Sequence, residues 1–370
     1  MIKIFLTSDN HIGLNKGNAE LYDNRIDVFE SMVNEANAEK CDIFVVAGDL
    51  FEDNIGHKKD IKKTFDILSR FNNTVAILPG NHDYYEKDLE FWNDIEKALE
   101  KHKNILLLNE YKEYSVKSIN DEDIVLYPAL CKSKHSKENA LGWIKNKKIV
   151  PDEKYRICVA HGSVDGETID AEGDYYCMTK KELEELSLDA YLIGHTHVPF
   201  PNNLKTSFSS VKDKIFNAGT HLQTNVNNNT EGLCFILEID QDKKIKAKKY
   251  VSGNIFYKRV VLNVKPGELK ETIQNEVKKY NKKTIIDLVL NGSLLMEEYE
   301  NREEIINEEL SGFMSYTYDS SNLSKSITKK FIESKFPETS FSAKLLKSLL
   351  KDPKETQLVY DLLQELKGGK

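Results

Sequence analysis

The sequence predicts an α/β fold built from strand–helix–strand units, followed by a second, smaller α/β domain. Three observations predict it. Short β-rich runs alternate with helical stretches from residue 1 to about residue 240. Five of those runs end in residues that can bind metals. The alternation starts again after Gly253, which indicates a separate domain.

Length and composition fit a folded protein of more than one domain. The chain has 370 residues, and a prior of about 150 residues per domain gives two or three domains. Apolar residues make up 40% and charged residues 30%, which excludes collagen-like, low-complexity and wholly disordered chains.

The first domain, expected at 1–255, is the larger one. Its clearest helix is 22–39, where apolar residues recur at helical spacing, and further helices are expected at 58–71 and 89–101. The expected strands are 2–7, 43–47, 75–78, 105–108, 124–127, 157–160, 191–193, 215–217 and 233–239.

The second domain is expected at 256–325 as a small βαβαβ unit. Its strands are predicted at 259–264, 284–291 and 313–318, and its helices at 267–280 and 297–310. The tail at 336–370 is predicted to be a helical hairpin: leucines fall on one face of 342–350, and Pro353 can sit in the first turn of a second helix. Such a hairpin either packs on its own domain or docks onto a partner.

Neither a membrane nor an oxidising compartment is indicated. No apolar run approaches the ~20 residues of a membrane span, and no signal peptide is evident, so a cytoplasmic location is expected. The five cysteines are odd in number and far apart, which argues against a disulfide framework or a thiolate zinc site.

Charge is unevenly distributed. The net charge of −8 argues against a free-standing binder of polyanions, but residues 241–290 carry thirteen lysines and arginines against five acids. This stretch is either a solvated surface or a contact for nucleic acid.

The metal-binding candidates follow five predicted strands directly and span nearly 190 positions. Each motif alone is better explained by a loop or a hydrogen-bonded histidine than by a metal site. Together they indicate a site, because side chains beyond the carboxyl ends of strands in an open α/β sheet can converge. The motifs are Asp9-Asn10-His11, Gly48-Asp49, Gly80-Asn81-His82-Asp83, His161-Gly162 and Gly194-His195-Thr196-His197.

The types of ligand indicate which metals and which reaction to expect. Carboxylate oxygens, one amide oxygen and several imidazoles suit a pair of divalent ions such as manganese, iron or zinc. Two ions about 3.5 to 4 Å apart can hold a hydroxide and stabilise an in-line displacement at phosphorus. The sequence therefore predicts a dinuclear centre for phosphoester hydrolysis.

In their order, these motifs resemble those of the calcineurin-like metallophosphoesterase superfamily. Within it, the chain is similar to the SbcD nuclease family, whose archaeal and eukaryotic relatives are the Mre-eleven DNA repair nucleases. The resemblance implies a four-layer α/β/β/α sandwich, a DNA-facing capping domain at 256–325, and a tail that binds an SbcC-like ATPase of the SMC type. It also implies a homodimer in which the helices at 22–39 and 89–101 pack across a twofold axis.

The resemblance also implies roles for individual residues. The ions are expected to be Mn²⁺, and one of them would be held by Asp9, His11 and His197. The other would be held by Asn81, His161 and His195, and Asp49 would bridge the two. His82 would then be the catalytic acid, or would stabilise the transition state near the leaving oxygen.

Glu52 is a departure from the family pattern. Many SbcD relatives carry a histidine three residues after the bridging aspartate, whereas the protein phosphatases of the superfamily carry an aspartate there that orients the Asn-His histidine. Glu52 could orient His82 in the same way, or it could be a solvated loop carboxylate. The phosphatase arginine is missing from residues 48–54, which disfavours a phosphoprotein phosphatase.

Three functions are compatible with these residues. The first is a manganese-dependent DNA nuclease, a 3′–5′ exonuclease on double strands and an endonuclease on single strands or hairpins, within an SbcCD-like complex. The alternative enzyme is a stand-alone phosphodiesterase or phosphatase for small nucleotides, which leaves the second domain and tail unexplained. The third is a non-catalytic scaffold, which would not need the complete ligand set.

Overall fold

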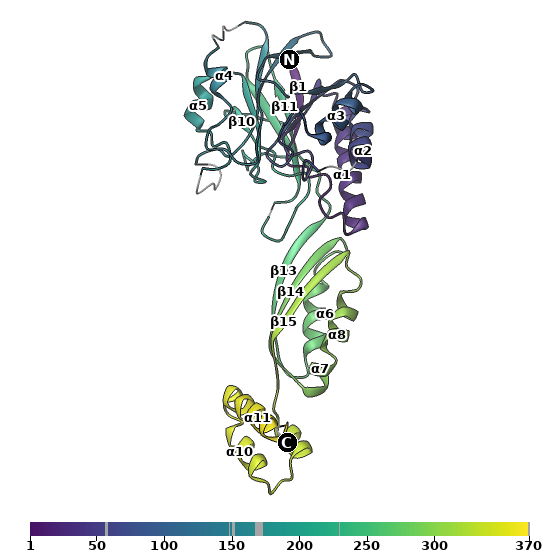
Figure 1. Cartoon of the computed structure of the whole chain (residues 1–370), viewed down its shortest axis with the longest axis vertical. Helices are drawn as coiled ribbons and strands as arrows, with labels where there is room; N and C mark the ends of the chain where they lie inside the picture. The colour runs from purple at the N-terminus through teal and green to yellow at the C-terminus, as the bar shows by residue number, and fades with distance from the viewer. Residues whose placement is uncertain (56–57, 148, 150–151, 167–172, 229, 369–370) are drawn as a thin grey trace. The chain divides into compact units, whose positions relative to one another are not determined.

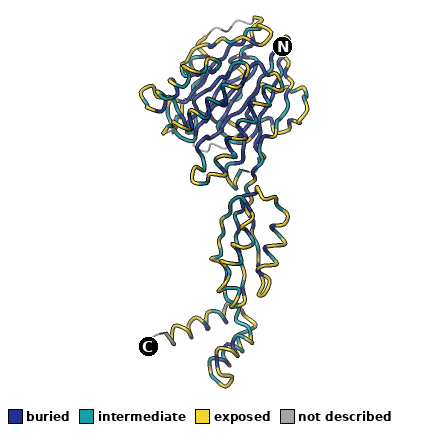
Figure 2. The backbone as a smooth tube through the Cα atoms, turned by 90° about the vertical axis from the view of Figure 1, so that its right-hand side faces the viewer, coloured by how far each residue is buried: buried dark blue, intermediate teal, exposed yellow. Residues whose placement is uncertain are grey.

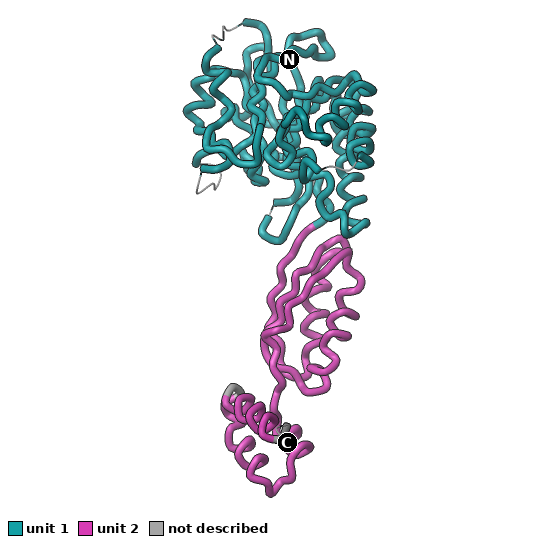
Figure 3. Tube along the Cα trace, viewed as in Figure 1, with its two compact units in different colours: residues 1–255 teal, residues 256–370 magenta. Residues whose placement is uncertain are grey.

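In the computed structural model, the chain divides into two compact units, Met1–Ile255 and Phe256–Lys370 (Figure 3). The structure describes residues 1–55, 58–147, 149, 152–166, 173–228 and 230–368. Each unit is described by itself below. Among the described residues, no helix has both the length and the apolar character needed to cross a membrane. All five cysteines are free thiols, as expected, and four of them are buried.

A seven-stranded sheet in the order β4-β3-β2-β1-β11-β12-β9 provides half of the first unit. β1 to β4 run parallel, so the loops that follow them leave at one edge of the sheet. β2 reads Ile-Phe-Val-Val-Ala and is buried throughout, which is typical of a strand covered on both faces. The strands are β1 (Ile2–Thr7), β2 (Ile43–Ala47), β3 (Thr74–Leu78), β4 (Ile105–Leu107), β9 (Ser209–Val211), β11 (Leu233–Ile239) and β12 (Ile245–Val251).

A five-stranded sheet in the order β10-β8-β7-β6-β5 provides the other half. All of its neighbours run parallel except β5, which pairs antiparallel with β6. The loops after β6, β7 and β8 therefore also share one edge. The strands are β5 (Tyr114–Lys117), β6 (Asp123–Ala129), β7 (Tyr155–His161), β8 (Ala190–Gly194) and β10 (Ile215–Phe216).

The two sheets pack face to face and helices cover their outer faces (Figure 1). Side chains alternate across each strand: Ile4 and Leu6 of β1 join the core between the sheets, whereas Phe5 joins the core under the helices. The expected four-layer α/β/β/α sandwich is confirmed. α1 (Ala19–Ala38), α2 (Lys58–Leu68) and α3 (Glu90–Leu99) cover the larger sheet, and α4 (Gly142–Lys145) and α5 (Lys180–Glu185) cover the smaller one.

Helix α1 begins earlier than its apolar pattern predicts. The side chain of Asn18 accepts a hydrogen bond from the Leu21 amide at 3.1 Å and caps the helix, so the first turn forms before the apolar stripe begins. The stripe itself, including Phe29 and Met32, is buried against the larger sheet as expected.

The second unit contains a parallel sheet of β13 (Phe256–Val264), β14 (Thr284–Leu294) and β15 (Ser315–Lys325). The helices α6 (Leu269–Val277), α7 (Met296–Glu300) and α8 (Arg302–Leu310) accompany it, and α6 and α8 share its core. The prediction of a single helix at 297–310 is wrong. The helix is broken at Asn301, whose backbone (φ −100, ψ 9) ends α7 and starts α8.

The tail at 336–370 contains two helices, as the leucine pattern predicts, and a third helix comes directly before it. α9 (Lys329–Lys335) precedes α10 (Phe341–Leu349) and α11 (Pro353–Gly368). Ile332 of α9 packs with Leu346 of α10 and Tyr360 of α11 in one small core. Figure 2 shows how much of these helices remains exposed.

The basic stretch 241–290 is divided between the two units. Several of its charges are also neutralised by acids, which weakens its interpretation as one nucleic-acid contact. The pairs include Lys248 with Glu39, Lys249 with Glu231, Arg259 with Asp287, and Lys270 with Glu308.

Candidate metal centre

The structure brings together all seven side chains expected to bind metal, together with His82. They lie at the carboxyl ends of β1, β2, β3, β7 and β8, where the two sheets place neighbouring loops together. Three clusters form, each with ligand atoms within 4.8 Å of one another: Asp9, His11 and His197; His11, Asp49 and His82; and Asp49, His161 and His195.

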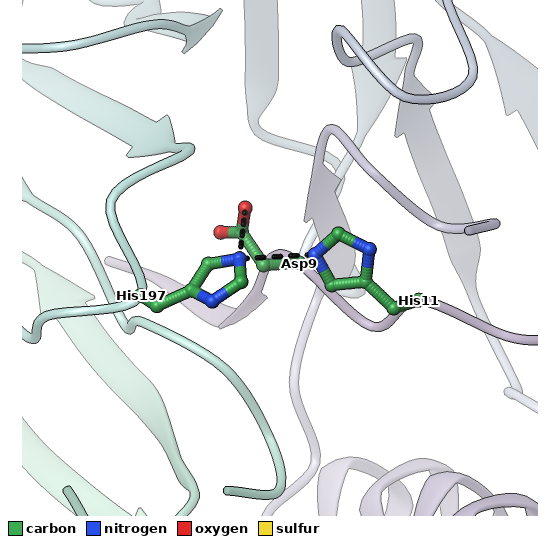
Figure 4. Close-up of side chains that lie close together, drawn as sticks. All are labelled: Asp9, His11 and His197. Carbon is green, nitrogen blue, oxygen red and sulfur yellow. Dashed lines mark hydrogen bonds and ion pairs between the residues drawn. The ribbon is translucent and has the colours of Figure 1, made fainter. Parts of the chain in front are cut away.

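The first cluster joins the loop after β1 to the loop after β8 (Figure 4). Nε2 of His11 and Nε2 of His197 are 3.0 Å apart, and the His197 nitrogen is 3.6 Å from Oδ1 of Asp9. Nδ1 of His11 lies 2.9 Å from Oε2 of Glu52, and this carboxylate favours the tautomer with the ring proton on Nδ1. The lone pair on the His11 Nε2 therefore faces the other two ligands, as in a cation site.

The cluster of Asp49, His161 and His195, which Asn81 joins, has the same property. Nδ1 of His161 donates to the Ala47 carbonyl at 2.9 Å, so in the neutral ring Nε2 has no proton to give. That nitrogen nevertheless faces Oδ1 of Asn81 at 2.9 Å and Oδ2 of Asp49 at 3.3 Å. Nδ1 of His195 is also 2.9 Å from the Asn81 oxygen. Acceptor atoms converging in this way fit a divalent cation, and the mixed N and O ligands suit manganese, iron or zinc.

Asp49 lies between His11 of the first cluster and His161. Its Oδ2 is 3.3 Å from the His161 Nε2 and 4.0 Å from the His11 Nε2. Its Oδ1 accepts the backbone amide of His82 at 2.8 Å, which ties the loops after β2 and β3 together. The residues are thus positioned to hold two divalent metal ions with one carboxylate between them.

Burial and neighbouring charges set the protonation of these groups. Burial alone would raise the pKa of Asp49, but His161 and His11 hold it well below its usual range. Burial and the charge of His161 lower the pKa of His195 to about 4, so this ring is neutral at pH 7 and available as a ligand. Burial lowers the pKa of His161 as well, but Asp49 outweighs it and raises that pKa to about 9. A bound cation would displace the extra proton.

Backbone strain concentrates at the site. Five of the seven expected ligands have positive φ, a region that costs most residues about 1–3 kcal/mol and is found at functional sites. The five are Asp9 (51°), His11 (47°), Asp49 (52°), His195 (117°) and His197 (54°).

Two glycines let the loops approach one another. A Cβ on Gly48, which has φ +91°, would lie 2.0 Å from Nδ1 of His161. A Cβ on Gly80 would lie 2.1 Å from Oδ1 of Asp49. Any other residue at either position would push a ligand away.

Glu52 contacts a different histidine from the one expected. Its carboxylate lies against His11, whereas His82 donates from Nδ1 to the Glu52 backbone carbonyl at 2.8 Å. The prediction that the Glu52 carboxylate orients His82 is therefore wrong, because the loop turns the Glu52 backbone carbonyl toward His82. The rings of His11 and His82 meet edge to face with centroids 4.8 Å apart.

Three further residues support the site and were given no role from the sequence. Oδ1 of Asp83 accepts the Gly80 amide at 2.7 Å and Oδ2 accepts the Phe51 amide at 3.0 Å; burial, reinforced by the Asp49 charge, raises the pKa of Asp83 to about 6. The buried Arg25 donates to the Asn10 carbonyl at 3.0 Å. The Tyr175 ring packs on His195. Only Asp83, which sits inside a motif, could have been found from the sequence.

Comparisons with known proteins agree with this geometry. The family model described as calcineurin-like phosphoesterase matches residues 2–199. The DNA double-strand break repair protein Mre11 of Archaeoglobus fulgidus is 28% identical over 211 residues, which cover 52% of this chain and 45% of the relative. The double-strand break repair protein MRE11 of Encephalitozoon cuniculi is 33% identical over 70 residues, 19% of this chain and 12% of the relative.

The chain therefore spans less than half the length of either curated relative. Among solved structures, a Thermus thermophilus protein aligns with a TM-score of 0.41 at 13% identity, covering 66% of this chain and 97% of that one. At that TM-score the alignment adds nothing to the fold described above.

Proposed function

Because the chain belongs to the calcineurin-like phosphoesterase family, whose members are metal-dependent hydrolases of phosphoester bonds, we propose that it is a nuclease that cleaves the phosphodiester bonds of DNA. The family expected from the motif order is thereby confirmed. The observation that carries the proposal is that two groups of ligands meet at one edge of the sandwich, with Asp49 between His11 of one group and His161 of the other.

Each cluster supplies ligands for one ion. Asp9, His11 and His197 would hold the first, and Asn81, His161 and His195 the second, with Asp49 between them. When bound, two divalent cations polarise a phosphoester and neutralise the charge that develops during its displacement. Mn²⁺ is the proposed ion in line with the family resemblance, and it is one of the ions that carboxylate, amide and imidazole ligands suit.

His82 is the proposed catalytic acid. Its Nδ1 donates to the Glu52 carbonyl, which fixes the ring and leaves Nε2 to hold a proton for the leaving oxygen. The ring is partly exposed beside the buried ligands, so a substrate can reach it. A histidine can exchange a proton near neutral pH. Glu52 contributes by positioning His11 and, through its carbonyl, His82.

DNA is the proposed substrate because two relatives are named as double-strand break repair proteins. In line with the family resemblance, we propose exonuclease activity on double-stranded ends in the 3′–5′ direction and endonuclease activity on single strands or hairpins. The capping role of residues 256–325 belongs to the same proposal.

The tail is the proposed docking site for an SbcC-like ATPase. Leu358, Leu362 and Leu366 of α11 recur every four residues and are 61%, 49% and 79% exposed, which makes an apolar stripe on one helix face. Replacing the three leucines by serine should abolish binding of such an ATPase, measured by co-purification, and leave hydrolysis of a small diester intact. A homodimer is also proposed, which light scattering would detect as twice the 42.5 kDa chain mass.

Three substrates test the proposal: end-labelled linear duplex DNA, a single-stranded DNA circle and bis-p-nitrophenyl phosphate, each with Mn²⁺ or EDTA. Cleavage of DNA that needs Mn²⁺ and is lost in His82→Ala would support it. Turnover of the small diester with both DNAs untouched, even after an SbcC-like protein is added, would instead favour a small-nucleotide phosphodiesterase.

A further inference from the structure

The loop that follows β6, residues 130–137, begins at the metal centre. β6 runs parallel to β7 with Ala129 paired to Ala160, so the loop leaves the sheet next to His161. Cys131 pins it there: its Sγ donates to the His161 carbonyl at 3.5 Å and its amide donates to the Pro79 carbonyl at 3.3 Å. We call this segment the β6 loop.

Backbone hydrogen bonds hold the β6 loop in one conformation. The hydroxyl of Tyr176 accepts the amides of Lys132 at 3.1 Å and Ser133 at 2.9 Å. Ser136 then pairs with the strand-like segment 174–176, donating to the Asp174 carbonyl and accepting the Tyr176 amide, both at 2.8 Å. The loop's outward side chains are therefore preorganised.

The outward side chains of the β6 loop are basic. Lys132, Lys134 and Lys137 lie within residues 130–137, which contain no acid; the exposed Glu138 follows directly, and Lys137 pairs with Asp174 at 3.8 Å. Among the described residues, no carboxylate lies within 4.0 Å of the Lys132 or Lys134 ammonium; that of Lys132 instead sits 4.2 Å from the Tyr111 ring centroid. Many other surface lysines pair with acids. These two charges remain available to an anion.

A series of rings leads from the centre to the loop. The Tyr175 ring packs on His195 in a tilted arrangement, with centroids 4.7 Å apart and planes at 33°, and His135 packs on Tyr175 at 5.0 Å and 52°. His135 is exposed and ends the series. Its ring thus offers an aromatic face in the same loop as Lys132 and Lys134.

From this arrangement we propose that the β6 loop binds the single-stranded segment of nucleic acid that enters the metal centre. Lys132 and Lys134 contact its phosphates, and His135 stacks on one of its bases. Proteins that bind single strands without sequence preference usually place positive charge along the nucleic-acid backbone and stack aromatic side chains on the bases. An unpaired base is required because a paired base is not free to stack on the ring. The inference rests on the proposed nuclease function and locates part of its substrate site.

The test measures binding of fluorescein-labelled 20-nucleotide probes by fluorescence anisotropy with Mn²⁺ present. The probes are oligothymidylate, an abasic chain with the same phosphates, and a duplex of the same length. All variants are made in the full chain carrying His82→Ala, which is expected to keep the probe uncut. Melting temperatures establish that each variant is folded, and Lys→Gln versions replace any alanine variant that is not.

The lysines are tested by salt dependence. Each phosphate contact to a single strand contributes about 0.7 to the slope of log affinity against log salt, so Lys132→Ala with Lys134→Ala should reduce the slope by about 1.4 for both single-stranded probes. Lys205→Ala with Lys212→Ala is the matched control, since it removes two exposed lysines outside the β6 loop. An equal decrease of the slope in both double variants would overturn the proposed phosphate contacts.

The ring is tested by comparing the probes. His135→Ala should weaken oligothymidylate binding about 5-fold, the lower end of the cost of losing one base stack, and leave abasic binding unchanged. His135→Phe should restore it. Equal effects on both single-stranded probes would overturn the stacking, and a duplex bound more tightly than the single strand with no dependence on His135 would overturn the single-strand assignment.

Wild-type hydrolysis of bis-p-nitrophenyl phosphate separates this inference from the function it rests on. If Mn²⁺-dependent hydrolysis occurs and oligonucleotide binding is unchanged by the substitutions in the β6 loop, the inference alone is overturned. Absence of hydrolysis, with binding that depends on the loop, would overturn the proposed function and support the β6 loop as a nucleic-acid site.

Discussion

Replacing Glu52 by glutamine should weaken metal binding through His11. Oε2 of Glu52 lies 2.9 Å from Nδ1 of His11, so the carboxylate fixes the ring and its tautomer and makes Nε2 a better ligand. Burial favours the neutral acid, yet the contact with His11 keeps the pKa of Glu52 below its usual value. Glutamine keeps the shape of the side chain and removes its charge.

The magnitude follows from the exposure of the carboxylate. Loss of a group that orients a metal ligand costs about 10- to 100-fold in affinity. The Glu52 side chain is 32% exposed, so water can partly replace it, and we expect the lower limit of about 10-fold, or ~1.4 kcal/mol. The backbone carbonyl that holds His82 is unchanged by the substitution, so the position of His82 is preserved.

Isothermal titration with Mn²⁺ measures this effect. It is done at pH 8, because Glu52, Asp49 and Asp9 together outweigh burial and raise the pKa of His11, so that protons compete with the cation at lower pH. Asp53→Asn is the control, since it removes the same charge one residue away. Equal weakening in both variants would refute the reasoning by showing that net charge alone matters, and so would unchanged affinity in Glu52→Gln.

Three further predictions concern stability. Gly48→Ala should lower the free energy of unfolding by at least about 2 kcal/mol and the melting temperature by roughly 4–8 °C, because its Cβ would meet His161 at positive φ. Gly17→Ala is the control and should change the melting temperature little, because open space surrounds its Cβ. Equal shifts of melting temperature in the two variants would contradict the steric argument. Glu182 caps α5 through the Thr179 amide and pairs with Lys145, and these contacts outweigh burial and lower its pKa to about 2. The stabilisation that ionised Glu182 gives the fold is therefore present above about pH 4.5 and lost as pH falls toward 2. Glu182→Gln should lower the free energy of unfolding in urea by about 1 kcal/mol at pH 7 and by almost nothing near pH 2. A loss of stability that does not change with pH would be inconsistent with this. Mn²⁺ at a hundred times its Kd should add about 2.7 kcal/mol per site to the free energy of unfolding, which EDTA should reverse in a thermal scan; identical melting with and without the ion would argue against a resident metal.

The sequence predicts the edge of the sheets where the site lies, because that inference needs only strand order and the direction of parallel strands. Asp49 follows a wholly apolar strand and His161 ends another, so both must lie at the carboxyl edge. The histidines of one motif then meet the acids of another even though nearly 190 positions separate them.

Contacts made by loops were beyond the reach of the pattern. The turn after Asp49 points the Glu52 carboxylate at His11 and its carbonyl at His82, and no spacing rule fixes that choice. Tyr175 reaches His195 only because segment 174–176 pairs with the β6 loop. Element ends were missed where local groups decide them, as at the Asn18 cap and the break at Asn301.

Electron paramagnetic resonance of the Mn²⁺-titrated protein tests the central claim most directly. If Asp49 lies between two ions, two equivalents of Mn²⁺ should bind per chain and give the spectrum of a spin-coupled pair, and Asp49→Asn should abolish the coupling. One bound equivalent, or two uncoupled ions in the wild type, would contradict the dinuclear centre from which the nuclease function is inferred.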